Sequence, residues 1–160
     1  MGELDDLRAR VEALRREYGA LPRDGWGEPG PVDEETGERW DRGHVLGHVA
    51  EMLPFWTAQV REVVGGGGDA MGRDDVGMAR RRMGIDAGRE AGEDGLLDRV
   101  DEGLAGVLAL LADLDDADLQ RRVVYRASRG EQESTVRGQL EQMLIGHAEG
   151  HLRQIQELGA

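Results

Sequence analysis

The sequence contains no cysteine, and this absence excludes several kinds of chemistry. A chain without cysteine has no disulfide framework, no thiolate nucleophile and no cysteine-based zinc site. Any metal ion must therefore be bound by His, Asp or Glu. Any sulfur nucleophile must come from a second molecule.

Long apolar runs and an excess of positive charge are also missing. No apolar run approaches the ~18 residues that a membrane span requires, and the first residues do not resemble a secretory signal peptide. The formal net charge is −13, whereas nucleic acid and anionic membrane surfaces both need a basic patch on their partner. We therefore expect a cytoplasmic protein that acts on a small molecule and binds neither nucleic acid nor a membrane.

Four segments show the apolar periodicity of amphipathic helices. The 160 residues are enough for one domain with a hydrophobic core, so we expect residues 1–160 to form a single domain. The periodicity predicts helices near residues 3–18, 41–64, 94–114 and 134–158. Pro54 is expected to kink or split the second helix, and Trp26, in the loop before it, to cover one end of the core.

The remaining segments are predicted to be mainly loops. Val123-Val124-Tyr125 has the composition of a short β run, and residues 126–133 are predicted to form a polar loop. Residues 65–93 are rich in glycine, and we interpret them as a long crossover with at most one short helical turn. A helix of about 24 residues is ~36 Å long, and about 11 extended residues can return that distance. The third helix can therefore start parallel to the second, which predicts an all-α four-helix bundle.

All four histidines of the chain fall into two pairs with the spacing H-x-x-x-H. The first pair is His44 and His48, and the second is His147 and His151, roughly a hundred residues later. Residues i and i+4 share one face of a helix, and the second pair lies on the apolar stripe of the fourth helix. Buried imidazoles need partners, and these are either hydrogen bonds in an ordinary core or a shared metal ion. The pairing of every histidine favours the metal.

Two of the helical segments resemble a known family. The stretch Leu144-Ile145-Gly146-His147-Ala148-Glu149-Gly150-His151-Leu152-Arg153-Gln154-Ile155 is similar to the last helix of the DinB-like superfamily, which includes mycothiol-dependent maleylpyruvate isomerase-like metalloproteins. Trp40 through Glu51 resembles the second helix of that family, which carries one ligand histidine after a leading tryptophan. The resemblance implies an up-down-down-up bundle with a divalent metal on His48, His147 and His151.

Three other features near these segments leave alternatives open. His44 is outside the family pattern, and it is either a solvated or capping histidine, a catalytic base in the pocket wall, or a stand-in metal ligand. Glu51 is either a surface charge or a residue that orients a ligand imidazole. Arg80-Arg81-Arg82 in the crossover is either a solvated charge run or a contact for an acidic group on a substrate.

Three histidine ligands leave coordination positions open to water or substrate. Zinc suits such a site best, and nickel also binds nitrogen ligands well. The family resemblance implies a transferase or isomerase that uses a low-molecular-weight thiol. The absence of Lys and Asn indicates a coding sequence rich in G and C and, with the resemblance, favours mycothiol. There are two alternative functions: a hydrolase that uses metal-bound hydroxide, and a non-enzymatic metal-binding bundle. A homodimer is possible in each case.

Overall fold

Helices make up most of the chain in the computed structural model, which describes residues 2–23, 32, 39–127 and 130–158. The long helices are α1 (Glu3–Gly19), α2 (Arg42–Val64), α3 (Asp75–Glu90) and α4 (Gly92–Asp113), followed by the short α5 (Asp116–Leu119). The last helical segment comprises α6 (Val136–Gln139), the π-helix η1 (Leu140–Ile145) and α7 (Gly146–Leu158). The four predicted helices are thus present, whereas Trp26 lies outside the described residues.

The ends of these helices follow the expected capping chemistry. The Asp41 side chain accepts a hydrogen bond from the His44 backbone N–H at 2.7 Å and begins α2. The Thr135 hydroxyl accepts one from the Gly138 N–H at 3.1 Å and begins α6. α2 continues through Pro54, so the predicted split of this helix does not occur.

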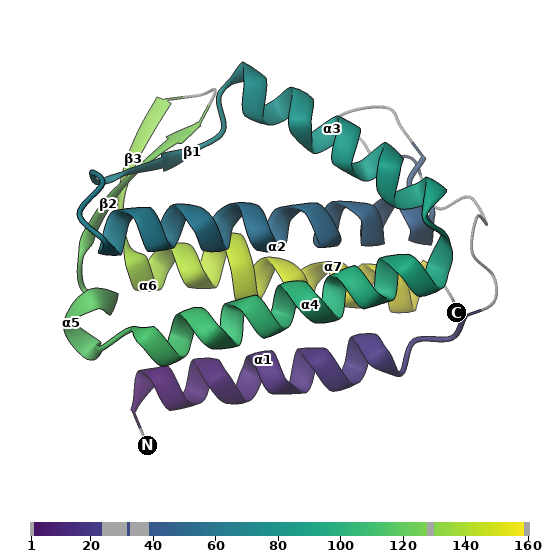
Figure 1. Ribbon diagram of the computed structural model, residues 1–160, viewed down its shortest axis with the longest axis horizontal. Coiled ribbons are helices and arrows are strands. Elements are labelled where there is room, and N and C mark those ends of the chain that lie inside the picture. Colours follow the sequence, from purple (N-terminus) through teal and green to yellow (C-terminus); the bar gives the residue numbers. More distant parts are fainter. Residues whose placement is uncertain (1, 24–31, 33–38, 128–129, 159–160) are drawn as a thin grey trace.

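Helices α1, α2 and α4 and the α6–α7 segment lie side by side in a bundle, and α3 lies outside it at an angle (Figure 1). α2 and α4 run in the same direction, and α1 and the α6–α7 segment run in the opposite one. Their apolar faces meet in a core that includes Leu14, Leu46, Leu104, Leu111 and Leu144. Within the part of the chain that the structure describes, no helix has the length and apolarity to cross a membrane.

A small sheet covers part of one side of the bundle, so the prediction of an all-α fold is wrong here. The strands β1 (Ala70–Gly72), β2 (Arg122–Ala127) and β3 (Gly130–Thr135) pair in the order β1-β2-β3, parallel and then antiparallel. β2 contains the predicted β run, but the end of β2 and the start of β3 occupy most of the predicted polar loop. The sequence GEQEST lacks apolar alternation because most of its side chains are exposed. Its conformation is set by pairing with β2.

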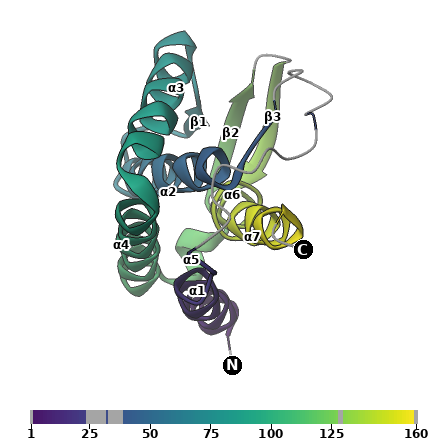
Figure 2. The ribbon, with the colours of Figure 1, turned by 90° about the vertical axis from the view of Figure 1, so that its right-hand side faces the viewer.

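The crossover contains a second departure from the prediction, because α3 is a full helix of 16 residues rather than one short turn. Glycines allow α3 to lie very close to α2: a Cβ on Gly47 would come within 2.9 Å of the Ile85 carbonyl oxygen, and one on Gly88 within 3.2 Å of the Gly47 Cα. Gly88, one of the glycines that suggested a loop, therefore permits this packing together with Gly47 of α2. Viewed along the bundle, α3 and the sheet rise on two sides of α2 (Figure 2).

Candidate metal centre

His48 comes from the buried side of α2. The helix begins at Asp41, and His48 follows two turns later with only 5% of its surface exposed. Its neighbour Gly47 lies against the backbone of α3. The position of the imidazole is therefore fixed by the packing of α2 against α3.

His147 and His151 come from α7, directly after the π-helical segment. A Cβ on Gly146 would lie 2.4 Å from the Glu141 carbonyl oxygen, so the junction between η1 and α7 requires glycine. The core stripe of α7 consists of Ala148, Leu152 and Ile155. The two histidines are only half-buried, at the edge of that stripe. The sequence predicts both histidines on the stripe itself. The π-helix has one extra residue in its turn, so it rotates the buried face of α7 relative to that of the preceding segment.

Contacts from α1 hold this region of the C-terminal segment in place. The buried Tyr18 hydroxyl donates a hydrogen bond to the Ala148 carbonyl at 2.6 Å. Arg10 donates two to the Glu141 carboxylate at 2.6 and 2.8 Å, and it also bonds the Glu149 carboxylate. Glu149 thus faces α1, away from the histidines, as its position in the helix predicts.

The structure brings His48, His147 and His151 together. Potential ligand nitrogens of the three imidazoles all lie within 4.8 Å of one another. The ring centroids are 5.3 Å apart for His48 and His147, 4.9 Å for His48 and His151, and 4.6 Å for His147 and His151. Three imidazole nitrogens gathered this closely could be the ligands of a single metal ion.

The hydrogen bonding of the three rings fits such an ion. His48 Nδ1, His147 Nδ1 and His151 Nε2 are buried and have no hydrogen-bond partner in the part of the chain that the structure describes. Buried nitrogens of this kind are costly unless something satisfies them. His151 Nδ1 lies 3.0 Å from Gln154 Oε1. A hydrogen bond there would place the proton on Nδ1 and leave the Nε2 lone pair available for a metal.

The three imidazoles are also in the correct protonation state. Burial lowers the pKa of His48 to about 2, with the positive charge of Arg81 as the next cause. Burial, followed by the neighbouring His151, lowers the pKa of His147 to about 4. Burial lowers the pKa of His151 as well. All three rings are therefore neutral near pH 7, which is the form that binds metal ions.

Trp40, which immediately precedes α2, packs over the three-histidine cluster. Its ring is stacked 6.4 Å from that of His151 and meets the ring of His48 edge-on at 5.9 Å. His44 is not part of the cluster, and its ring lies 4.0 Å from Trp40 on another side. The structure thus separates His44 from the three predicted ligands, and its catalytic role stays a prediction.

Glu51 has neither of the roles considered for it from the sequence. It forms two hydrogen bonds with the Arg73 guanidinium, at 2.6 and 2.8 Å, and both side chains are largely buried. The same guanidinium lies 3.9 Å from the ring centroid of Phe55. This pair joins α2 to the start of the crossover. Arg73 carried no signal in the sequence, because neither apolar periodicity nor a motif includes it.

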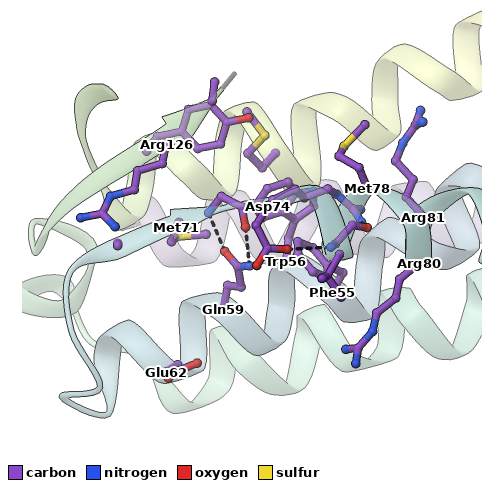
Figure 3. A pocket seen from close by; sticks show the side chains of 18 of the residues that line it. Phe55, Trp56, Gln59, Glu62, Met71, Asp74, Met78, Arg80, Arg81 and Arg126 are labelled. Carbon is purple, nitrogen blue, oxygen red and sulfur yellow. Dashed lines mark hydrogen bonds between the residues drawn. The ribbon is translucent and has the colours of Figure 1, made fainter. Parts of the chain in front are cut away.

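A cavity of about 1050 Å³ extends from the three histidines along α2 (Figure 3). Its walls come from α2, β1, α3, β2 and the C-terminal segment, and they include Phe55, Trp56, Met71, Tyr125 and Met143. Gln59 fixes β1 in this wall, since its amide donates to the Gly72 carbonyl at 2.7 Å and accepts from the Gly72 N–H at 2.9 Å. The cavity is large enough for a small organic molecule with its reacting end at the histidines.

Comparison with known proteins supports the resemblance seen in the two histidine segments. The profile of the DinB superfamily matches residues 3–155, which include all the long helices and all four histidines. No curated protein and no solved structure matches the chain significantly.

Proposed function

The chain belongs to the DinB superfamily, and on this premise we propose that it is a metal-dependent enzyme with His48, His147 and His151 as the metal ligands. The observation that carries this proposal is the cluster of three neutral imidazoles, each with a buried nitrogen that lacks a partner among the described residues. Zinc suits this donor set best, and nickel is the second choice. With three protein ligands, the ion keeps a coordination position for substrate.

We propose that the reaction is the transfer of a low-molecular-weight thiol, such as mycothiol, to a small molecule, or a thiol-dependent isomerisation. A metal ion held by His48, His147 and His151 would lower the pKa of a bound thiol and so favour the thiolate near neutral pH. The chain has no cysteine, so the sulfur must come from the cosubstrate. Trp40 restricts access of water at the metal end, and the apolar side chains of the cavity hold the organic part of the substrate.

Nucleic acid and membrane surfaces are not expected to be partners, given the formal net charge of −13. The substrate is instead a small molecule that enters the cavity. Whether two copies associate does not affect this proposal, since the three histidines and the lining residues belong to one chain.

Metal analysis of purified protein tests the ligand assignment. Wild type should contain about one equivalent of metal, and His48→Ala, His147→Ala and His151→Ala should each lose it. His44→Ala is the matched control, because it removes an imidazole from the same face of α2 and should leave the metal content unchanged. Loss of metal in His44→Ala with retention in His48→Ala would show that the assignment is wrong.

A turnover assay then separates the reaction types. The metal-loaded protein is incubated with a small electrophile such as monochlorobimane, with and without mycothiol, and product formation is followed by fluorescence. Turnover that requires the thiol supports the transferase. Hydrolysis of ester substrates without thiol would support a metal-dependent hydrolase, and metal binding without any turnover would support a binding protein.

A further inference from the structure

Helix α3 carries apolar side chains on two opposite faces. Its inner face packs on α2 through Ile85 and through glycines such as Gly88. On its outer face, Val76 and Met83 are 61% and 71% exposed, and they are two of the four large apolar side chains that are exposed among the described residues. A helix that is apolar on both sides is normally covered on both sides. The outer face of α3 is therefore a candidate interaction surface.

The apolar residues on the outside of α3 form a continuous stripe, which we call the α3 face. Its members are all exposed, and they are Val76, Ala79, Met83 and Ala87. Spacings of three and four residues place them on one side of the helix. α3 also lies at the outer edge of the molecule, beyond α2 (Figure 1, Figure 2). Another molecule can therefore contact the α3 face without displacing the bundle.

Charge favours a second copy of this chain at the α3 face. The sequences of α1, α2 and α4 each contain at least as many acidic residues as arginines, with six against one in α4. The sequence of α3 contains four arginines and three acidic residues. Since each copy has a formal net charge of −13, most surfaces of two copies repel each other. Among these long helices, the repulsion is therefore weakest at α3.

The charged residues beside the stripe are self-complementary. Arg82 and Asp86 are both exposed, and the helical period places them on the same side of Met83. In two antiparallel α3 helices related by a twofold axis near Met83, Arg82 of each copy lies beside Asp86 of the other. Two pairs of opposite charges then accompany a centre formed by Met83 from both copies.

We propose that two copies of the chain associate through the α3 face, as an antiparallel twofold pair of α3 helices with Met83 of both copies at its centre. A helix of 16 residues is about 24 Å long, so this contact is small compared with the interfaces of permanent dimers. The dimer is therefore expected to dissociate on dilution. None of the three histidines takes part in the contact, so the inference does not depend on the proposed metal site.

Sedimentation velocity over a dilution series tests this dimer. Met83→Glu places a charge at the centre of the contact, and glutamate preserves the helix because its helix propensity is high. Val32→Glu is the matched control, because it adds the same charge at an apolar side chain that is 48% exposed and lies outside α3. Circular dichroism checks the helix content of each variant.

Wild type and Val32→Glu should form the same dimer at high protein concentration. Met83→Glu should raise the dissociation constant at least about tenfold, since the burial of one large apolar side chain is worth roughly this factor. A wild type that stays monomeric at every concentration would overturn the inference, and so would equal dimerisation of Met83→Glu and Val32→Glu.

A mixing experiment tests the antiparallel arrangement through a gain of association. Arg82→Glu and Asp86→Arg each bring like charges together in their own dimers, so each variant alone should associate more weakly than wild type. An equimolar mixture restores both opposite-charge pairs, and its dissociation constant should be lower than that of either variant alone. A mixture that associates no more tightly than the separate variants would overturn the inference.

Discussion

The two helices α3 and α4 both pack against α2, but they do so in different ways. α4 buries a stripe of large side chains, including Leu97, Val100, Leu104 and Leu111. α3 buries one large apolar side chain, Ile85, and otherwise approaches α2 through glycines, while Val76 and Met83 are 61% and 71% exposed. The first arrangement gains its stability from apolar burial and the second from close backbone approach and the Arg73–Glu51 pair. We therefore expect α4 to be part of the global folding unit, and α3 to open locally at lower free energy.

The largest effect on global unfolding is expected in α4. Leu104→Ala removes a fully packed side chain and leaves a cavity, so the free energy of unfolding should fall by about 2–5 kcal/mol. Urea denaturation followed by circular dichroism measures this loss. Met83→Ala in α3 is the control and should change it by less than about 0.5 kcal/mol, because Met83 is exposed. A similar loss of unfolding free energy in Leu104→Ala and Met83→Ala would contradict the difference in apolar burial between α4 and α3.

The second prediction concerns the pair that fixes α3. Glu51→Ala leaves the largely buried Arg73 guanidinium without its carboxylate, and breaking buried pairs costs about 3–5 kcal/mol. Because Arg73 lies two residues before α3, the loss should appear as local opening rather than as global unfolding. Hydrogen exchange should become faster in residues 75–90 and remain slow in residues 92–113. Equal acceleration in both helices would mean that they unfold as one unit.

The glycine contacts give a third and smaller effect. Gly47→Ala places a methyl group within 2.9 Å of the Ile85 carbonyl oxygen, so α3 must shift outward. Overpacking of this kind costs about 1–3 kcal/mol. Gly106→Ala is the matched change in α4, where the added Cβ meets nothing within 4 Å. Gly106→Ala should raise the free energy of unfolding by up to about 1 kcal/mol, because alanine has a higher helix propensity than glycine. Urea denaturation should therefore show a loss of stability for Gly47→Ala and a gain for Gly106→Ala.

The smallest effect is expected from the surface network between α1 and η1. The hydrogen bond from Arg10 lowers the pKa of Glu141 below its usual value of 4.5. A carboxylate with a lowered pKa in the folded state stabilises the fold above its unfolded pKa, and this contribution disappears as the pH falls. Arg10→Gln should therefore reduce stability at pH 7, and the difference from wild type should shrink below about pH 4.5.

Thermal unfolding at pH 7 and at pH 3 measures this pH dependence. Arg8→Gln provides a control on the same helix, since Arg8 pairs only with the exposed Asp5 among the contacts of the described residues. A difference between Arg10→Gln and wild type that grows at low pH would contradict the proposed role of Arg10.

The comparison of α3 and α4 also explains how far sequence analysis could reach. Helices α1, α2 and α4 have apolar stripes with a helical period, so their positions could be predicted to within about two residues. α3 has no such stripe, because glycines replace the large side chains at its contact with α2. β3 has no alternation because most of its side chains face solvent, so only its pairing with the neighbouring strand β2 defines it.

The amino-acid sequence by itself determined the helices with strong apolar periodicity and the presence of two histidine pairs at one-turn spacing. These features depend on local geometry, which repeats every few residues. The family resemblance had already set His44 apart from the other three histidines. Only the tertiary structure paired Glu51 with Arg73 and placed the Arg81 guanidinium near the ring of Trp40. These contacts depend on packing between segments that are distant in the chain, which no local pattern records.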